Sequence, residues 1–179
     1  MFWNDDIPRY QADGVEVTVI AGQLGQAEPL NPPPDSWAAA ADSDVAIWHT
    51  RLDAGARWSP PQAKPTSNRV LYLFDGELTI AGETIAQNTG VVLDPSAEFE
   101  IETGDAGAEA LGLQGRPIGE PVAQYGPFAL NDEAGIRQAM ADYQRTQFGG
   151  WPWPSDDPVH GDMPERFARY ADGTEFVAK

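Results

Sequence analysis

The clearest indication of the fold comes from residues 69–80, RVLYLFDGELTI. The first six residues form a nearly continuous apolar run, which is typical of a β-strand covered on both faces. Asp75 and Gly76 follow directly, and this dipeptide favours a tight hairpin turn. A second strand is therefore predicted at residues 77–80, and the two strands together should contribute to a buried core.

Similar short strands are predicted on both sides of this hairpin. Residues 15–20 place three valines on one face and Glu, Thr and Ile on the other, which indicates a strand with one buried face. Further strands are predicted at residues 45–52, 83–85, 90–93, 97–102 and 108–114. A spacing of about 8–12 residues with turn residues between strands is typical of an all-β sandwich or barrel.

A long loop and one helix interrupt the strand pattern. Residues 22–35, GQLGQAEPLNPPPD, predict a loop because prolines cannot donate to a β-ladder, and its length suggests a functional or docking role. Asn131 is a suitable N-cap for a helix that ends at the two glycines 149–150. After it, WPWP at residues 151–154 predicts an extended tail, and a short helix is predicted at residues 164–170.

Composition excludes several classes of function. Eleven Lys and Arg against 28 Asp and Glu give a net charge of −17, which repels phosphate backbones and anionic membranes. The absence of cysteine excludes disulfides and thiolate metal sites, and two histidines are too few for a three-histidine metal site. Neither a signal peptide nor an apolar window near 18 residues is visible, so we expect an acidic, soluble, cytoplasmic protein.

The two histidines are the obvious candidates for chemistry. His49 lies in a predicted strand and should point partly inward, either as a lone ligand or base or as a hydrogen-bonded residue near a barrel end. His160 is close in sequence to Asp156 and Asp157, which could supply acid–base catalysis or form a solvated loop. We favour the non-catalytic alternative for both histidines: a hydrogen-bonded residue for His49 and a solvated loop for His160. No catalytic or cofactor-binding residue is predicted.

Three motifs in the C-terminal half carry a family resemblance: GRPIGEPV at residues 115–122, YGPFALN at 125–131 and FGGWPW at 148–153. They resemble the C-terminal signature of the pirin family, and PRYQ at residues 8–11 with the loop after Ile20 fits the same family. The strand with Tyr72 resembles the centre of a cupin domain. The resemblance extends from about residue 3 to about residue 168.

The resemblance implies a fold and a division of the chain. Residues 15–130 should form a cupin-type double-stranded β-helix, a jelly-roll barrel. An irregular inter-domain lead-in at residues 1–14 should precede it. Residues 131–179 should form a C-terminal helix and a Trp/Pro-rich tail that packs on the barrel.

Pirins consist of two cupin barrels, and the N-terminal barrel holds a metal, usually iron, through three His and one Glu. The resemblance implies that this chain is the C-terminal barrel, without metal or cofactor, because Arg69 stands about where the Glu would be. We therefore expect a domain that supports a metal-bearing N-terminal cupin of a quercetin 2,3-dioxygenase-type oxidoreductase and is inactive alone. A regulatory or protein-interaction module is the alternative. His49 and Arg69 remain the candidates for a polar site in or near the barrel.

Four aromatic residues near the chain ends are candidates for an interface: Phe2, Trp3, Trp151 and Trp153. The two tail tryptophans could stack on a ligand, but large aromatic rings more often pack against protein. We expect this set to line the face toward the N-terminal cupin or toward a second copy of the chain, and we expect neither nucleic acid nor a membrane as partner.

Overall fold

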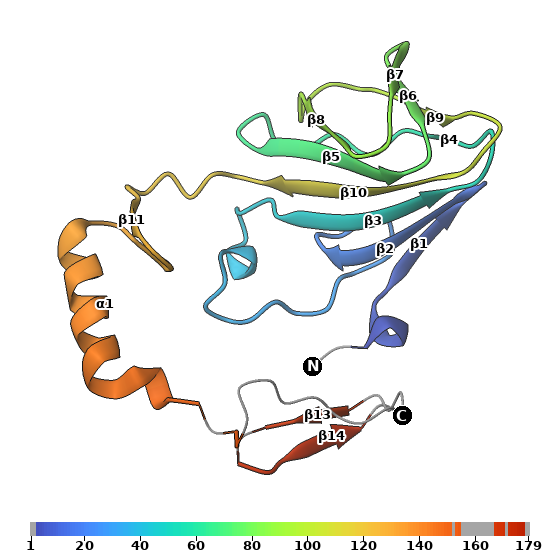
Figure 1. Ribbon diagram of the computed structural model, residues 1–179. Helices are drawn as coiled ribbons and strands as arrows, with labels where there is room; N and C mark the ends of the chain where they lie inside the picture. The colour runs from blue at the N-terminus through green and yellow to red at the C-terminus, as the bar shows by residue number, and fades with distance from the viewer. Residues whose placement is uncertain (1–2, 152, 155–166, 171, 178–179) are drawn as a thin grey trace. The chain divides into compact units, whose positions relative to one another are not determined.

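The computed structural model describes residues 3–151, 153–154, 167–170 and 172–177 of the chain (Figure 1). Two compact units are present, one spanning Phe2–Ile118 and the other Gly119–Lys179. In this division residues 3–14 belong with the barrel strands and residues 119–130 belong with the helix, whereas the sequence predicts divisions after residues 14 and 130.

The first unit contains two antiparallel sheets, so the expected all-β class is confirmed. The larger sheet has six strands in the order β1 (Arg9–Ala12), β2 (Val15–Ala21), β3 (Ala46–Leu52), β10 (Ala108–Gly115), β5 (Asn68–Asp75) and β8 (Thr89–Leu93). The smaller sheet has four in the order β4 (Arg57–Trp58), β9 (Ile101–Thr103), β6 (Leu78–Ile80) and β7 (Glu83–Ile85). Figure 1 shows the smaller sheet lying over one side of the larger.

One apolar cluster joins the buried residues of both sheets. In β2, the valines at positions 15, 17 and 19 are buried, as their alternation predicts. The prediction that β5 is covered on both faces is wrong: Leu71 and Leu73 are buried, but Tyr72 between them is 38% exposed. The reason is that the smaller sheet contributes to the core on one face of β5 only, so its outward side chains remain accessible.

The lead-in and one late strand also differ from the sequence-based expectations. A 3-10 turn, η1 (Asn4–Asp6), precedes β1, and β1 pairs with β2, so the predicted irregular lead-in is partly a strand. The strand predicted at residues 97–102 is confined to β9, because only there does the chain pair with β4 and β6. A second 3-10 turn, η2 (Trp37–Ala39), lies within the long loop.

Within its described residues, the second unit contains two hairpins and one α-helix. β11 (Ala123–Tyr125) pairs with β12 (Phe128–Leu130), both contact α1 (Glu133–Thr146), and a 3-10 turn, η3 (Gln147–Gly149), follows the helix. β13 (Phe167–Arg169) pairs with β14 (Glu175–Val177). The helix predicted at residues 164–170 is therefore wrong over its described part, because pairing with β14 holds that segment extended.

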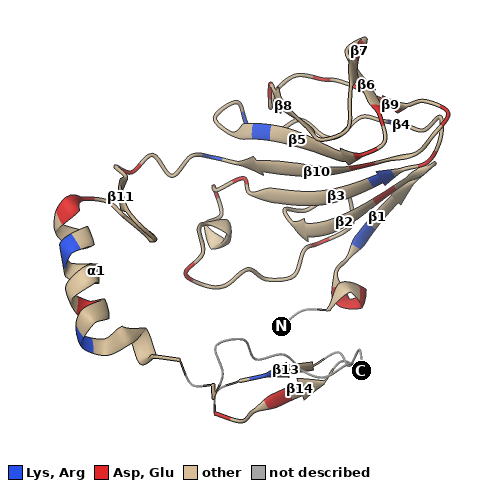
Figure 2. Ribbon diagram, viewed as in Figure 1, with Lys and Arg blue, Asp and Glu red and all other residues tan. Residues whose placement is uncertain are grey.

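Acidic residues are distributed along both units rather than gathered on one element (Figure 2). Within the described part of the chain, the helices are too short and too polar to cross a membrane.

The cap of α1 is Asp132, not the predicted Asn131, and its side chain accepts a hydrogen bond of 2.7 Å from the amide of Gly135. Replacing Asp132 with Ala should destabilise the helix by about 1 kcal/mol, because one of the first-turn amides loses its acceptor. Circular dichroism during thermal unfolding measures this loss. Asp132→Asn is the matched control, since an Asn side chain can also cap; an equal loss in both variants would argue against capping as the cause.

Candidate functional site

Arg69 is the charged residue that the fold carries into the barrel interior. It lies on β5, and strand alternation places it on the same face as Leu71 and Leu73. Only 6% of its surface remains exposed. Arg69, which the sequence proposes for a polar site in or near the barrel, is therefore a cation in the barrel interior.

The direct partner of Arg69 is Gln114 on the neighbouring strand β10, and the register places the two residues opposite each other. The Nε of Arg69 donates to Gln114 Oε1 at 2.9 Å, and Nη2 donates to the same oxygen and to the carbonyl of Pro61 at 2.9 Å. These bonds fix the plane of the guanidinium. Gln114 was not singled out by the sequence, because only the pairing of β5 with β10 brings it to Arg69.

Asp44 extends this network. Its carbonyl accepts from the Gln114 side-chain amide at 3.1 Å, while its carboxylate accepts from the amide of Lys64 at 3.1 Å and the hydroxyl of Ser67 at 2.6 Å. Burial lowers the pKa of Arg69 from its ordinary value, and the nearby charge of Asp44 opposes that change. An arginine starts from so high a pKa that the guanidinium stays charged at neutral pH.

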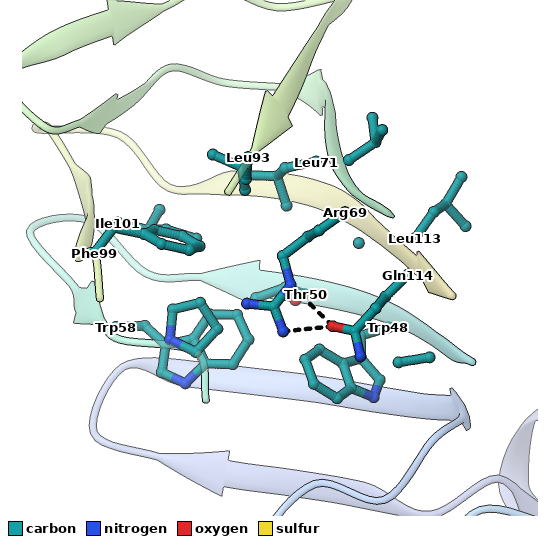
Figure 3. A pocket seen from close by; sticks show the side chains of 14 residues that line it. Trp48, Thr50, Trp58, Arg69, Leu71, Leu93, Phe99, Ile101, Leu113 and Gln114 are labelled. Atoms are coloured by element: carbon teal, nitrogen blue, oxygen red, sulfur yellow. Dashed lines mark hydrogen bonds between the residues drawn. The ribbon is translucent and has the colours of Figure 1, made fainter. Parts of the chain in front are cut away.

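Arg69 is one of the residues that line a small cavity inside the barrel (Figure 3). Its volume is about 30 Å³, and its walls are mainly apolar, with Trp48, Trp58, Phe99 and Ile101 among them. Arg69 is the single titratable residue among the 14 that line it. The barrel interior is thus an apolar chamber with one positive charge.

A much larger cleft, of about 760 Å³, opens beside this cavity. Residues of the long loop, including Pro29, Leu30 and Pro33, form one wall. Four residues line both the cleft and the cavity: Ala46, Trp48, Arg69 and Gln114. A volume of this size is within the range of small-molecule sites, so the loop predicted to have a functional or docking role does border a candidate site.

Two tryptophans anchor the loop that forms this wall. The indole of Trp48 donates to the carbonyl of Gly22 at 3.0 Å, and the indole of Trp37 donates to the carbonyl of Arg116 at 2.9 Å. The Arg116 guanidinium also lies 4.6 Å from the centre of the Trp37 ring, a cation–π contact. The wall of the cleft is therefore held at both ends by side-chain bonds.

His49 lies on the other face of the sheet, because its neighbours Trp48 and Thr50 are the buried residues of β3. Its Nε2 is 2.8 Å from Oε2 of Glu109, and its ring packs 5.6 Å from that of Phe74. The expectation that His49 points partly inward is wrong, because the strand alternation that buries Trp48 turns His49 to the other face of the sheet. The structure therefore does not bring His49 and Arg69 into one site.

The donor set of a metal centre does not fit this barrel. Among the described residues, no group of three or more His, Cys, Asp or Glu is arranged to hold a metal ion. Where the resemblance would place a carboxylate ligand, Arg69 contributes a cation held by Gln114 and Pro61. His160, Asp156 and Asp157 lie outside the described residues, and the absence of a bound metal stays a prediction.

The interface candidates are placed only within their own units. Trp3 is partly buried in the first unit, and in the second unit Trp151 is 58% exposed and Trp153 partly buried. Phe2 lies outside the described residues. Packing of the tail on the barrel therefore stays a prediction.

Residues 47–149 match the family model described as the pirin C-terminal cupin domain. The chain belongs to the pirin family. This confirms the resemblance carried by the motifs at residues 115–153 and makes the two-sheet barrel a C-terminal cupin domain. The match covers both Arg69 and Gln114.

Relatives of this pirin chain support the assignment. A Pseudomonas aeruginosa protein named "Putative quercetin 2,3-dioxygenase" is 38% identical over 147 residues, covering 78% of this chain and 49% of the relative. A pirin-like protein of Caulobacter vibrioides is 33% identical over 150 residues, covering 82% of this chain and 51% of the relative. This chain spans about half the length of the curated relatives it matches.

A solved structure shows the same fold. The crystal structure of quercetin 2,3-dioxygenase from Acinetobacter baumannii matches with a TM-score of 0.66 and 24% identity, covering 82% of this chain and 49% of that one. At this identity the likeness concerns the fold, and it confirms the cupin barrel predicted from the motifs.

Proposed function

We propose that this pirin-family chain is a metal-free C-terminal cupin that supports a metal-bearing N-terminal cupin in a quercetin 2,3-dioxygenase-type oxidoreductase. The observation that carries the proposal is the buried guanidinium of Arg69, fixed by Gln114 and Pro61 beside an apolar cavity. A fixed positive charge in the barrel repels a metal cation, so the oxygen chemistry belongs to the other barrel.

The share of each relative's length that this chain matches supports the same division of roles. The matched stretch covers about half of each relative, and the one from Pseudomonas aeruginosa is named for quercetin dioxygenation. The remaining half of such a protein has room for a second cupin. In this arrangement the present chain stabilises its neighbour and contributes surface, and quercetin or a related flavonol is the substrate of the pair.

Two assays test the proposal. The untagged chain should bind less than about 0.1 equivalent of iron, nickel or copper and should not consume quercetin, because redox chemistry of this kind needs a metal. Elemental analysis and quercetin absorbance measure the two quantities. The full-length Pseudomonas aeruginosa relative, prepared in parallel, controls for metal supply and assay conditions. Near-stoichiometric metal, or metal-dependent loss of quercetin with the chain alone, would contradict the proposal.

Adding the separately produced N-terminal half of that relative distinguishes support from regulation. The supporting role predicts that the two halves sediment together and that quercetin turnover rises when they are mixed. Binding without any change in turnover would favour the regulatory alternative, in which the barrel is an interaction module.

A further inference from the structure

One nitrogen of the interior arginine has no hydrogen-bond partner. Nη1 of Arg69 is buried, and within the part of the chain that the structure describes no atom accepts from it. The other two nitrogens of the same guanidinium donate to Gln114 and Pro61. Buried donors are almost always paired, because leaving one unpaired forfeits the hydrogen bonds it would make with water.

Figure 3 shows where this nitrogen is directed. The two dashed lines from Arg69 end on the oxygen of Gln114, and the remaining nitrogen is turned to the opposite side, toward Trp58 and Phe99. Both of those side chains line the cavity of about 30 Å³. Rotating the guanidinium to find another partner would break its bonds to Gln114 and Pro61, so Nη1 stays on the side of Trp58 and Phe99, whose side chains line the cavity.

The charge of Arg69 is compensated only from outside the cavity. No carboxylate lines the cavity among its 14 residues. Asp44 attracts the guanidinium electrostatically, but its carboxylate accepts from Lys64 and Ser67. Buried charges in proteins are normally paired, so the cavity side of Arg69 favours a negative group.

We propose that the barrel interior binds one small monovalent anion, of the size of chloride or formate, in the cavity beside Arg69. The cavity is large enough for a particle of about this size, since a water molecule needs roughly 10–15 Å³ of comparable volume. The anion enters from the wider cleft, which shares Ala46, Trp48, Arg69 and Gln114 with the cavity. A water molecule in the cavity would leave the charge uncompensated.

The net charge of −17 does not prevent this binding. At about 0.1 M salt, charges separated by more than roughly 10 Å are largely screened from each other. The group that acts on the anion is therefore the guanidinium in direct contact with it, and the apolar walls strengthen that attraction.

Thermal unfolding at constant ionic strength tests the proposal. Replacing sodium gluconate, whose anion is too large for the cavity, with sodium chloride, bromide, nitrate or formate should raise the melting temperature saturably, by about 3 °C. Comparing the rise of the melting temperature in chloride with the rise in formate shows whether the site prefers a halide or a small carboxylate. Arg69→Met should lose the increase. Arg57→Met, which removes an exposed arginine of the first unit, should keep it.

Crystals of the wild-type chain grown with bromide give a second, independent measurement. The anomalous signal of bromide should appear in the cavity beside Arg69. Equal melting temperatures in gluconate and chloride, with no bromide at Arg69, would mean that the cavity holds water only and would overturn the proposal. An equal increase in Arg69→Met would also overturn it; should that variant fail to fold, the bromide position in the wild type decides.

Discussion

Replacing Gln114 with Leu should lower the free energy of unfolding by about 3 kcal/mol, because it leaves a buried charge without its principal acceptor. Gln114 Oε1 accepts from Nε of Arg69 at 2.9 Å and also from Nη2. Leucine fills a similar volume but accepts no hydrogen bond. Chemical denaturation in gluconate buffer measures the loss without interference from small anions.

The double variant Arg69→Met/Gln114→Leu separates the charge effect from packing. Removing both partners together leaves apolar side chains in an apolar interior, so most of the stability lost in Gln114→Leu should return. Gln11→Leu, at an exposed glutamine bonded to Glu16, is the matched control and should change the free energy by less than about 0.5 kcal/mol. If Gln114→Leu costs no more than this control, the Arg69–Gln114 pair does not stabilise the barrel.

Replacing Trp48 with Ala should lower the free energy of unfolding by about 4 kcal/mol, the middle of the usual range for a large buried aromatic side chain. Trp48 is 7% exposed, packs edge-on against Trp58 at 6.5 Å between ring centres, and donates to the carbonyl of Gly22 at 3.0 Å. Its loss would widen the passage between the cavity and the cleft and free one end of the loop. Denaturant unfolding measures the stability change.

Trp48→Phe provides the intermediate case. Phenylalanine keeps most of the packing against Trp58 but cannot donate to Gly22, so the loss should be clearly smaller than for Ala. Proteolysis within residues 22–35 should rise in both variants, because both release the same anchor of the loop. A cost below about 1.5 kcal/mol for Trp48→Ala would show that the barrel tolerates the cavity and would contradict this account.

Local pattern was a good guide to the strands and a poorer guide to element ends. The alternation in β2 predicted its buried valines, because strand geometry by itself assigns alternate residues to one face. The cap of α1 was misplaced by one residue, since Asn131 and Asp132 are both good caps and only the backbone decides between them. Phe167–Arg169 is extended because it pairs with Glu175–Val177, a contact that helical periodicity does not encode.

The sequence by itself determined the all-β class, the family and the presence of an arginine where a metal ligand would be expected. Tertiary structure alone decided that this arginine is buried, that Gln114 and Pro61 hold it, and that His49 faces away from it. Gln114 lies 45 residues from Arg69 in the chain. The two meet because β5 and β10 pair in one register, and a shift of one residue would turn each side chain to the opposite face.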